Sequence, residues 1–161
     1  MYYSINSKSN TPSLEEFAFN VWFKIEDVNA AQQSIFNITN NIGTSVGFYV
    51  SVLNGSIRFA VNGIIQDSLG GLVNDTFYML TFLRIDDSGL KWRGYLDGVE
   101  FFNSSVLANT DLSNYSFYFG RRDANYADEM TQDETLFYLD TPLSVAAIGD
   151  LFNNGDGLFI S

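Results

Sequence analysis

Residues 77–103, FYMLTFLRIDDSGLKWRGYLDGVEFFN, decide the fold of this chain. Residues 77–85 and 90–96 alternate along their length and are rich in side chains that favour strands. The turn-forming residues 86–89 separate these two strands, and Asp97-Gly98, the strongest short signal of a β-hairpin, precedes a third strand at residues 99–103. A meander of this kind cannot bury its apolar face alone, so the pattern predicts a second sheet that covers it.

The remainder of the chain continues the alternation of strands and turns. Residues 17–25 predict a half-buried strand, because Phe17, Phe19, Val21 and Phe23 share one face. Further strands are predicted at residues 2–5, 34–39, 47–53, 57–61, 64–66, 115–120, 135–139 and 157–161.

The turns and the helix follow the same logic. Two Asn-Gly steps, at residues 54–55 and 62–63, predict tight hairpins in a second meander. Residues 144–152 predict one short helix near the C-terminus, with Ser144 as its N-cap. Turn spacing predicts an all-β domain of about ten to thirteen strands that takes up residues 1–161.

The composition excludes several classes of function. The chain has 161 residues, of which 46% are hydrophobic, enough for one domain with its own core. It contains no cysteine, which excludes disulfides and thiolate metal sites. It contains no histidine either, which excludes serine triads, imidazole acid–base catalysis and zinc–imidazole sites.

The charge of the chain narrows its partners. A net charge of −11 argues against nucleic acid and anionic membrane surfaces, because both attract positive charge. No apolar run approaches the ~20 residues of a transmembrane helix. The first ten residues, MYYSINSKSN, lack the charged and apolar regions of a signal peptide. If the protein acts outside a cell, we therefore expect it to leave as part of a larger particle or by another route, with no membrane insertion.

Several short motifs in a fixed order carry a family resemblance. They are Trp22-Phe23, the hairpin Tyr95-Leu96-Asp97-Gly98, Phe119-Gly120-Arg121, Asp133-Glu134, Leu143-Ser144 and Leu151-Phe152-Asn153. In this order the chain resembles the concanavalin A-like lectin/glucanase superfamily, and specifically its laminin-G-like jelly-roll domains, over residues 14–155. An alternative alignment places Asp128-Glu129 at the position of Asp133-Glu134.

The resemblance implies both a fold and a kind of function. The fold is a two-sheet antiparallel β-sandwich, a jelly roll whose loops or concave face bind carbohydrate or protein. Many such domains hold one Ca²⁺ at the rim, which implies Asp133 as a ligand together with backbone carbonyls. An Asn-rich chain that starts with Met and lacks a signal peptide is most similar to the virion-associated members.

The carboxylates give no sign of glycoside hydrolysis. Glucanases of this superfamily carry acidic residues as E-x-D-x-E on one strand, because residues two apart share a face and meet at one glycosidic bond. None of the acidic pairs in this chain has that spacing, and most lie in turns, where Asp is common for other reasons. We therefore expect no enzymatic activity.

The meander offers a candidate binding surface. If its two arginine-bearing faces both point outward, five residues would form a shallow platform on which sugar rings stack and to which sugar hydroxyls bind. These residues are Tyr78, Phe82, Arg84, Arg93 and Tyr95. Alternatively, the same aromatic side chains only cover a solvated sheet.

A basic doublet lies after a predicted strand. Arg121-Arg122 would stand at a rim, where it could meet an anionic sugar or an acidic partner, or only balance nearby carboxylates.

Two functions from different classes follow from these observations together. One is a lectin-like module on a phage or virion surface that recognises host glycans. The alternative is a structural or decoration protein that binds other virion subunits and no sugar.

Overall fold

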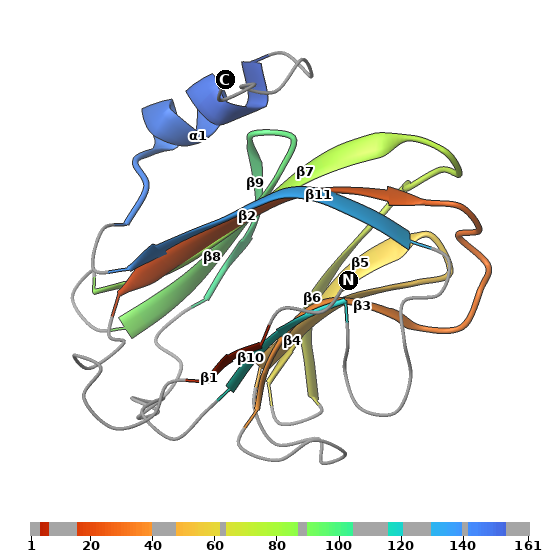
Figure 1. The fold of residues 1–161 in the computed structure, drawn as a ribbon, viewed down its shortest axis with the longest axis horizontal. Coiled ribbons are helices and arrows are strands. Elements are labelled where there is room, and N and C mark those ends of the chain that lie inside the picture. The colour runs from red at the N-terminus through yellow and green to blue at the C-terminus, as the bar shows by residue number, and fades with distance from the viewer. Residues whose placement is uncertain are drawn as a thin grey trace. The chain divides into compact units, whose positions relative to one another are not determined.

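The computed structural model describes residues 4–6, 16–39, 48–61, 64–86, 90–104, 116–120, 130–139 and 142–153. Within these residues the chain forms eleven strands and one short helix (Figure 1). They are β1 (Ser4–Asn6), β2 (Phe17–Ile25), β3 (Gln33–Thr39), β4 (Phe48–Leu53), β5 (Ser56–Val61), β6 (Ile64–Gly70), β7 (Phe77–Asp86), β8 (Leu90–Leu96), β9 (Val99–Asn103), β10 (Ser116–Phe119), β11 (Met130–Leu139) and α1 (Val145–Phe152).

The strands belong to two sheets. A six-stranded sheet has the order β1-β10-β3-β4-β5-β6, and a five-stranded sheet has the order β11-β2-β7-β8-β9. The chain divides into two compact units: the first contains the six-stranded sheet, and the second contains most of the five-stranded sheet together with α1. In the described part of the chain, no helix is long and apolar enough to cross a bilayer.

The six-stranded sheet forms the core of the first unit. Its antiparallel register places Phe36, Val50 and Phe59 side by side on one face, where all three are buried. Strands β4 and β5 are joined by the predicted Asn54-Gly55 turn, in which both residues have positive φ angles, 50° and 65°. The predicted Asn62-Gly63 turn lies outside the described residues.

One edge of the six-stranded sheet is longer than the sequence predicts. Residues 64–66 are the predicted strand, but β6 continues to Gly70, because pairing with β5 resumes after a register shift beside Phe59 and Ala60. This edge strand exposes apolar side chains, with Ile64 67% and Ile65 48% exposed.

The five-stranded sheet is buried on both faces along β2. The sequence predicts a half-buried strand here, but Ala18, Asn20 and Trp22, on the second face, are buried as well. For Ala18 and Trp22 the reason is α1, because Ile148 of this helix packs in one cluster with both of them. A local alternating pattern cannot indicate that a helix near the other end of the sequence covers this face.

The C-terminal part of the sheet also differs from the prediction. The sequence places a strand at residues 135–139, whereas β11 begins at Met130 and passes through Asp133-Glu134. Glu134 has a positive φ of 47°, which marks a local distortion inside this strand. The predicted strand at residues 157–161 lies outside the described residues.

Candidate functional site

The register of β7 and β8 separates the five residues of the predicted platform. Tyr95 lies opposite Thr81, and Arg93 lies opposite Leu83. Neighbouring positions along a strand point to opposite faces, so these two side chains share a face that Tyr78, Phe82 and Arg84 do not. The prediction of one outward platform made of all five residues is therefore wrong.

Tyr95 is a core residue. Its side chain is 2% exposed and belongs to the cluster that packs beneath α1, together with Met79 and Leu83. Its hydroxyl donates a hydrogen bond to Glu100 Oε2 at 2.9 Å. Burial first, and then this bond, raise the pKa of the Tyr95 phenol, while Arg93 lowers it in part.

The other face of the platform is also closed by packing. Phe82 is 0% exposed and stacks on Phe19, with their ring centroids 5.9 Å apart. Arg84 is 3% exposed, and its guanidinium carbon lies 5.8 Å from the ring centroid of Trp92. Tyr78 is half-buried and lies 5.8 Å from the ring of Phe23. Phe82 and Arg84 are buried in the packed interior and Tyr78 is partly covered, so the prediction that these residues form an exposed surface does not hold.

The remaining predicted site residues are not gathered into one place. Arg121 and Arg122 lie outside the described residues, so their role stays a prediction. Asp133 is exposed, and its Oδ1 accepts a hydrogen bond from the backbone N–H of Glu134 at 2.9 Å. Within the described residues no group of three or more acidic side chains is arranged to hold a metal ion, and calcium binding at Asp133 stays a prediction.

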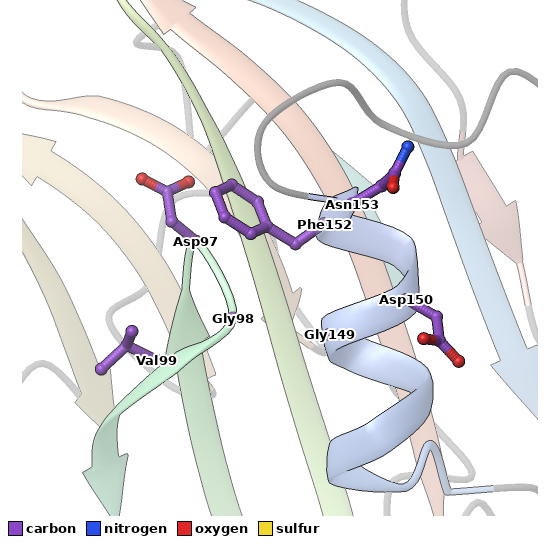
Figure 2. A pocket seen from close by; sticks show the side chains of 7 residues that line it. All are labelled: Asp97, Gly98, Val99, Gly149, Asp150, Phe152 and Asn153. Carbon is purple, nitrogen blue, oxygen red and sulfur yellow. The ribbon is translucent and has the colours of Figure 1, made fainter.

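A cleft of about 550 Å³ lies between the β8–β9 turn and the end of α1 (Figure 2). It is lined by Asp97, Gly98, Val99, Gly149, Asp150, Phe152 and Asn153. This volume is within the range of roughly 300–1,000 Å³ that is usual for small-molecule sites.

The turn that forms one wall is held in place by β7. Asp97 and Gly98 both have positive φ angles, 51° and 77°, as the Asp-Gly hairpin signal predicts. The backbone N–H of Asp97 donates to Met79 O at 2.9 Å. The Asp97 Oδ1 atom in turn accepts from the Met79 N–H at 2.8 Å. This reciprocal pair of bonds fixes the carboxylate at the turn.

The other wall is the last turn of α1. The helix begins after Ser144, whose hydroxyl accepts the backbone N–H of Ala147 at 3.1 Å. It ends at Asn153, which adopts a left-handed conformation and donates its N–H to Gly149 O. The ring of Phe152 lies 6.0 Å from Trp22 at an interplanar angle of 17°, and this stacking anchors the helix end on β2.

The close-up shows how the two walls meet (Figure 2). Phe152 reaches from the helix towards the turn, and an added Cβ at Gly98 would lie 3.7 Å from its ring. The Asp97 carboxylate stands at the turn, whereas Asp150 projects from the other side of the helix. The two carboxylates therefore stand apart: that of Asp97 is beside the aromatic ring, and α1 separates the ring from Asp150.

The charges that surround the cleft have one sign. In the part of the lining that the structure describes, both charged residues are acidic, and the last turn of α1 contains no basic residue to offset the negative end of the helix dipole. Burial raises the pKa of the Asp97 carboxyl above its ordinary value of 3.8, against the lowering effect of the hydrogen bond from Met79. The cleft thus offers hydrogen-bond acceptors, an aromatic ring and two glycines.

Sequence reasoning found the parts of this cleft without joining them. The sequence predicts Asp97-Gly98 as a turn and Phe152-Asn153 as the end of a helix. Nothing in local patterning indicates that two segments so far apart in the chain are neighbours. The available signal is that β8 and α1 each end in a sharp turn. The residue that follows each element, Asp97 or Asn153, adopts a left-handed conformation.

Comparison with known proteins identifies a family. A laminin-G family model, described as the concanavalin A-like lectin/glucanases superfamily, matches residues 1–140. No curated protein sequence matches the chain. Together with the two antiparallel sheets, the family match confirms the predicted all-β class and the concanavalin A-like sandwich fold. The match ends before α1, so the helix wall of the cleft lies outside it.

Solved structures of toxin domains are similar in fold. The receptor binding domain of botulinum neurotoxin D has a TM-score of 0.67 and 16% identity, over 96% of this chain and 41% of that chain. The serotype D ligand binding domain in complex with N-acetylneuraminic acid has a TM-score of 0.66 and 17% identity, over 95% and 40%. The type G receptor binding domain has a TM-score of 0.61 and 13% identity, over 96% and 42%. The present chain spans about two fifths of these domains.

Proposed function

Because the chain belongs to the concanavalin A-like lectin/glucanases superfamily, we propose that it is a non-catalytic carbohydrate-binding module. Its sugar site is the cleft between the Asp97-Gly98 turn and the end of α1, and this cleft is the observation that carries the proposal. The lining suits a sugar. The carboxylates accept hydrogen bonds from sugar hydroxyls, the side-chain amide can also donate to them, and the aromatic ring packs against apolar C–H faces.

Two further observations support the proposal: the first argues against catalysis, and the second favours sugar binding. The chain has neither histidine nor cysteine, and no strand carries the E-x-D-x-E spacing of the glucanases. A structural neighbour is described in complex with N-acetylneuraminic acid, so a domain of related fold occurs in a sugar-binding protein. In its finer form, the proposal places the module on a phage or virion surface, where it recognises host glycans.

A substitution at Gly149 tests the site. This glycine lines the cleft on an exposed helix, and an added Cβ would meet nothing within 4 Å. Gly149→Phe should fill the cleft without disturbing the core, while Gly149→Ala adds only one methyl group and favours the helix. We expect a glycan array, run with and without Ca²⁺, to give hits for the wild type and the Ala variant and weak or no signal for the Phe variant.

The result that contradicts the site is equally clear. Undiminished binding by Gly149→Phe, with an unchanged melting temperature, would move the sugar site away from the cleft. Loss of all hits on Ca²⁺ removal, with the cleft intact, would instead favour a calcium-dependent site such as the one predicted at Asp133.

The exposed edge strand favours a second candidate function. Strand β6 presents Ile64, Ile65 and Leu69 at the edge of the six-stranded sheet, and such an edge can pair with another chain. A structural or decoration protein that binds other subunits would use this surface. No glycan hits and a discrete oligomer by light scattering, which Ile64→Lys converts to a monomer, would favour this function over sugar binding.

A further inference from the structure

We infer that the cleft is selective for amino sugars, that is, for glycans whose residues carry free protonated amines, and that it rejects anionic sugars such as N-acetylneuraminic acid. This inference rests on the proposed function, since it names the class of sugar for the same cleft. It also departs from the ligand of the structural neighbour, which is an acidic sugar.

The charge described around the cleft is negative. Asp97 and Asp150 both line it, and among the described residues its lining contains no Lys or Arg. The whole chain has a net charge of −11, so no distant excess of positive charge compensates. A sugar carboxylate placed here would meet like charge without a cationic partner, and such a contact is unfavourable.

The end of α1 also favours a cation in the cleft. Residues 149–153 are the last turn and the cap of α1, where the helix dipole places partial negative charge. Cations are favoured at this end of a helix, and the sequence supplies none in the last turn. An ammonium group on the ligand would take the place that Lys or Arg occupies at the ends of other helices.

The side chains of the cleft suit an organic amine better than a bare metal ion. Ca²⁺ requires six to eight oxygen ligands, and the described residues contain no group of three or more acidic side chains that could hold a metal. Of the two carboxylates, only that of Asp97 stands beside the Phe152 ring, because Asp150 projects from the other side of α1 (Figure 2). A carboxylate beside an aromatic ring is a setting that suits an ammonium group, through charge-assisted hydrogen bonds and cation–π attraction.

The separation of the carboxylates also indicates an oligosaccharide. Asp97 stands at the turn and Asp150 on the far side of the helix, so one small amine cannot contact both in this arrangement. A chain of two or more amino sugars can place one amine beside Asp97 and Phe152 and extend around the end of the helix towards Asp150. The family match ends at residue 140, so this selectivity arises from the helix that the match does not include.

A matched pair of oligosaccharides tests the inference. The β-1,4-linked glucosamine tetramer and its fully N-acetylated counterpart differ only at nitrogen, which is a free amine in the first and an acetylated amide in the second. At pH 6 we expect the free amine to be protonated and the glucosamine tetramer to bind about tenfold or more tightly, as charge-assisted hydrogen bonds predict. A sialylated oligosaccharide should give no measurable binding. Isothermal titration calorimetry at low and at high salt measures all three, and the preference should shrink at high salt.

Two carboxylate variants locate the preference. Asp97→Asn keeps an oxygen that can accept the Met79 N–H and keeps a residue that tolerates the turn, and Asp150→Asn changes an exposed side chain. We expect the double variant to lose most of the preference for the amine, with a melting temperature no lower than that of the wild type. Glu26→Gln removes one exposed carboxylate elsewhere and should leave the preference intact.

The outcomes separate the inference from the function on which it rests. Equal or tighter binding of the N-acetylated tetramer, or binding of the sialylated sugar, overturns the inference and leaves carbohydrate binding in place. A preference that survives in the double variant also overturns it, because the net charge of the chain and not the cleft would then attract the amine. If no oligosaccharide and no array glycan binds, the proposed function itself fails.

Discussion

Two hairpin turns in this protein have the same chemistry and different surroundings. Asn54-Gly55 and Asp97-Gly98 each join two antiparallel strands, and each has positive φ at both residues. The first turn is tied to neighbouring loops, because the Gly55 N–H donates to Val28 O and its carbonyl accepts from the Leu72 N–H. The second turn abuts α1 and leaves a cleft beside it. The sequence therefore specifies the turn, and the neighbouring element decides whether a site forms.

The largest effect is expected from removing the anchor of the helix that borders the second turn. Ile148 is fully buried on the inner face of α1, so Ile148→Ala should destabilise the fold by about 3 kcal/mol through the lost contacts and the cavity that remains. Urea unfolding measures the total. Hydrogen exchange should show increased exposure around Gly98 and little change around Gly55, and equal changes at the two turns would contradict this separation.

The two glycines should differ in their tolerance of a side chain. Both have positive φ, so Ala is strained at either position by roughly 1 kcal/mol. At Gly55, however, the added Cβ would lie 3.2 Å from Leu72 O, whereas at Gly98 the nearest atom is 3.7 Å away in the Phe152 ring. We expect Gly55→Ala to cost about 2 kcal/mol and Gly98→Ala about 1 kcal/mol. A larger loss at Gly98 in thermal unfolding would mean that the cleft is packed more tightly than its geometry indicates.

The first residues of the two turns differ in what their side chains do. Asp97 accepts the Met79 N–H, so Asp97→Ala loses a hydrogen bond in addition to the strain of Ala at positive φ. Asn54→Ala carries the same strain and serves as the matched control. The difference between their unfolding free energies should be about 1 kcal/mol, the worth of a part-buried hydrogen bond. Equal losses would show that the bond from Met79 contributes nothing net.

The smallest effect concerns pH. Burial raises the folded-state pKa of Asp97 above its ordinary 3.8, so the folded protein holds this proton more tightly than the unfolded chain does. The contribution of Asp97 to stability is therefore complete below the ordinary pKa and is lost as the pH rises through the raised pKa. Asp97→Asn cannot ionise, so it should gain stability relative to the wild type as the pH rises across that window. The exposed Asp133→Asn controls for net charge, and a parallel gain in it would contradict the assignment to Asp97.

Much of the fold could be predicted from the sequence because it depends on local patterns. The bounds of β2, β8 and β9 agree with the alternation and turn signals, and the Ser144 cap marks the start of α1 as predicted. The prediction fails where distant elements meet. Residues Tyr95 and Phe82 look alike as exposed aromatics in a pattern, but one packs beneath α1 and the other against Phe19.

The sequence by itself determined the elements, the two turns and the absence of histidine and cysteine chemistry, because propensity, periodicity and composition act over a few residues. Only the tertiary structure decided which faces are buried, and that Asp97-Gly98 and Phe152-Asn153 line one cleft. Burial and proximity depend on residues that are far apart in the chain. A turn and a helix end that are each ordinary in the sequence acquire a candidate function only when the fold brings them together.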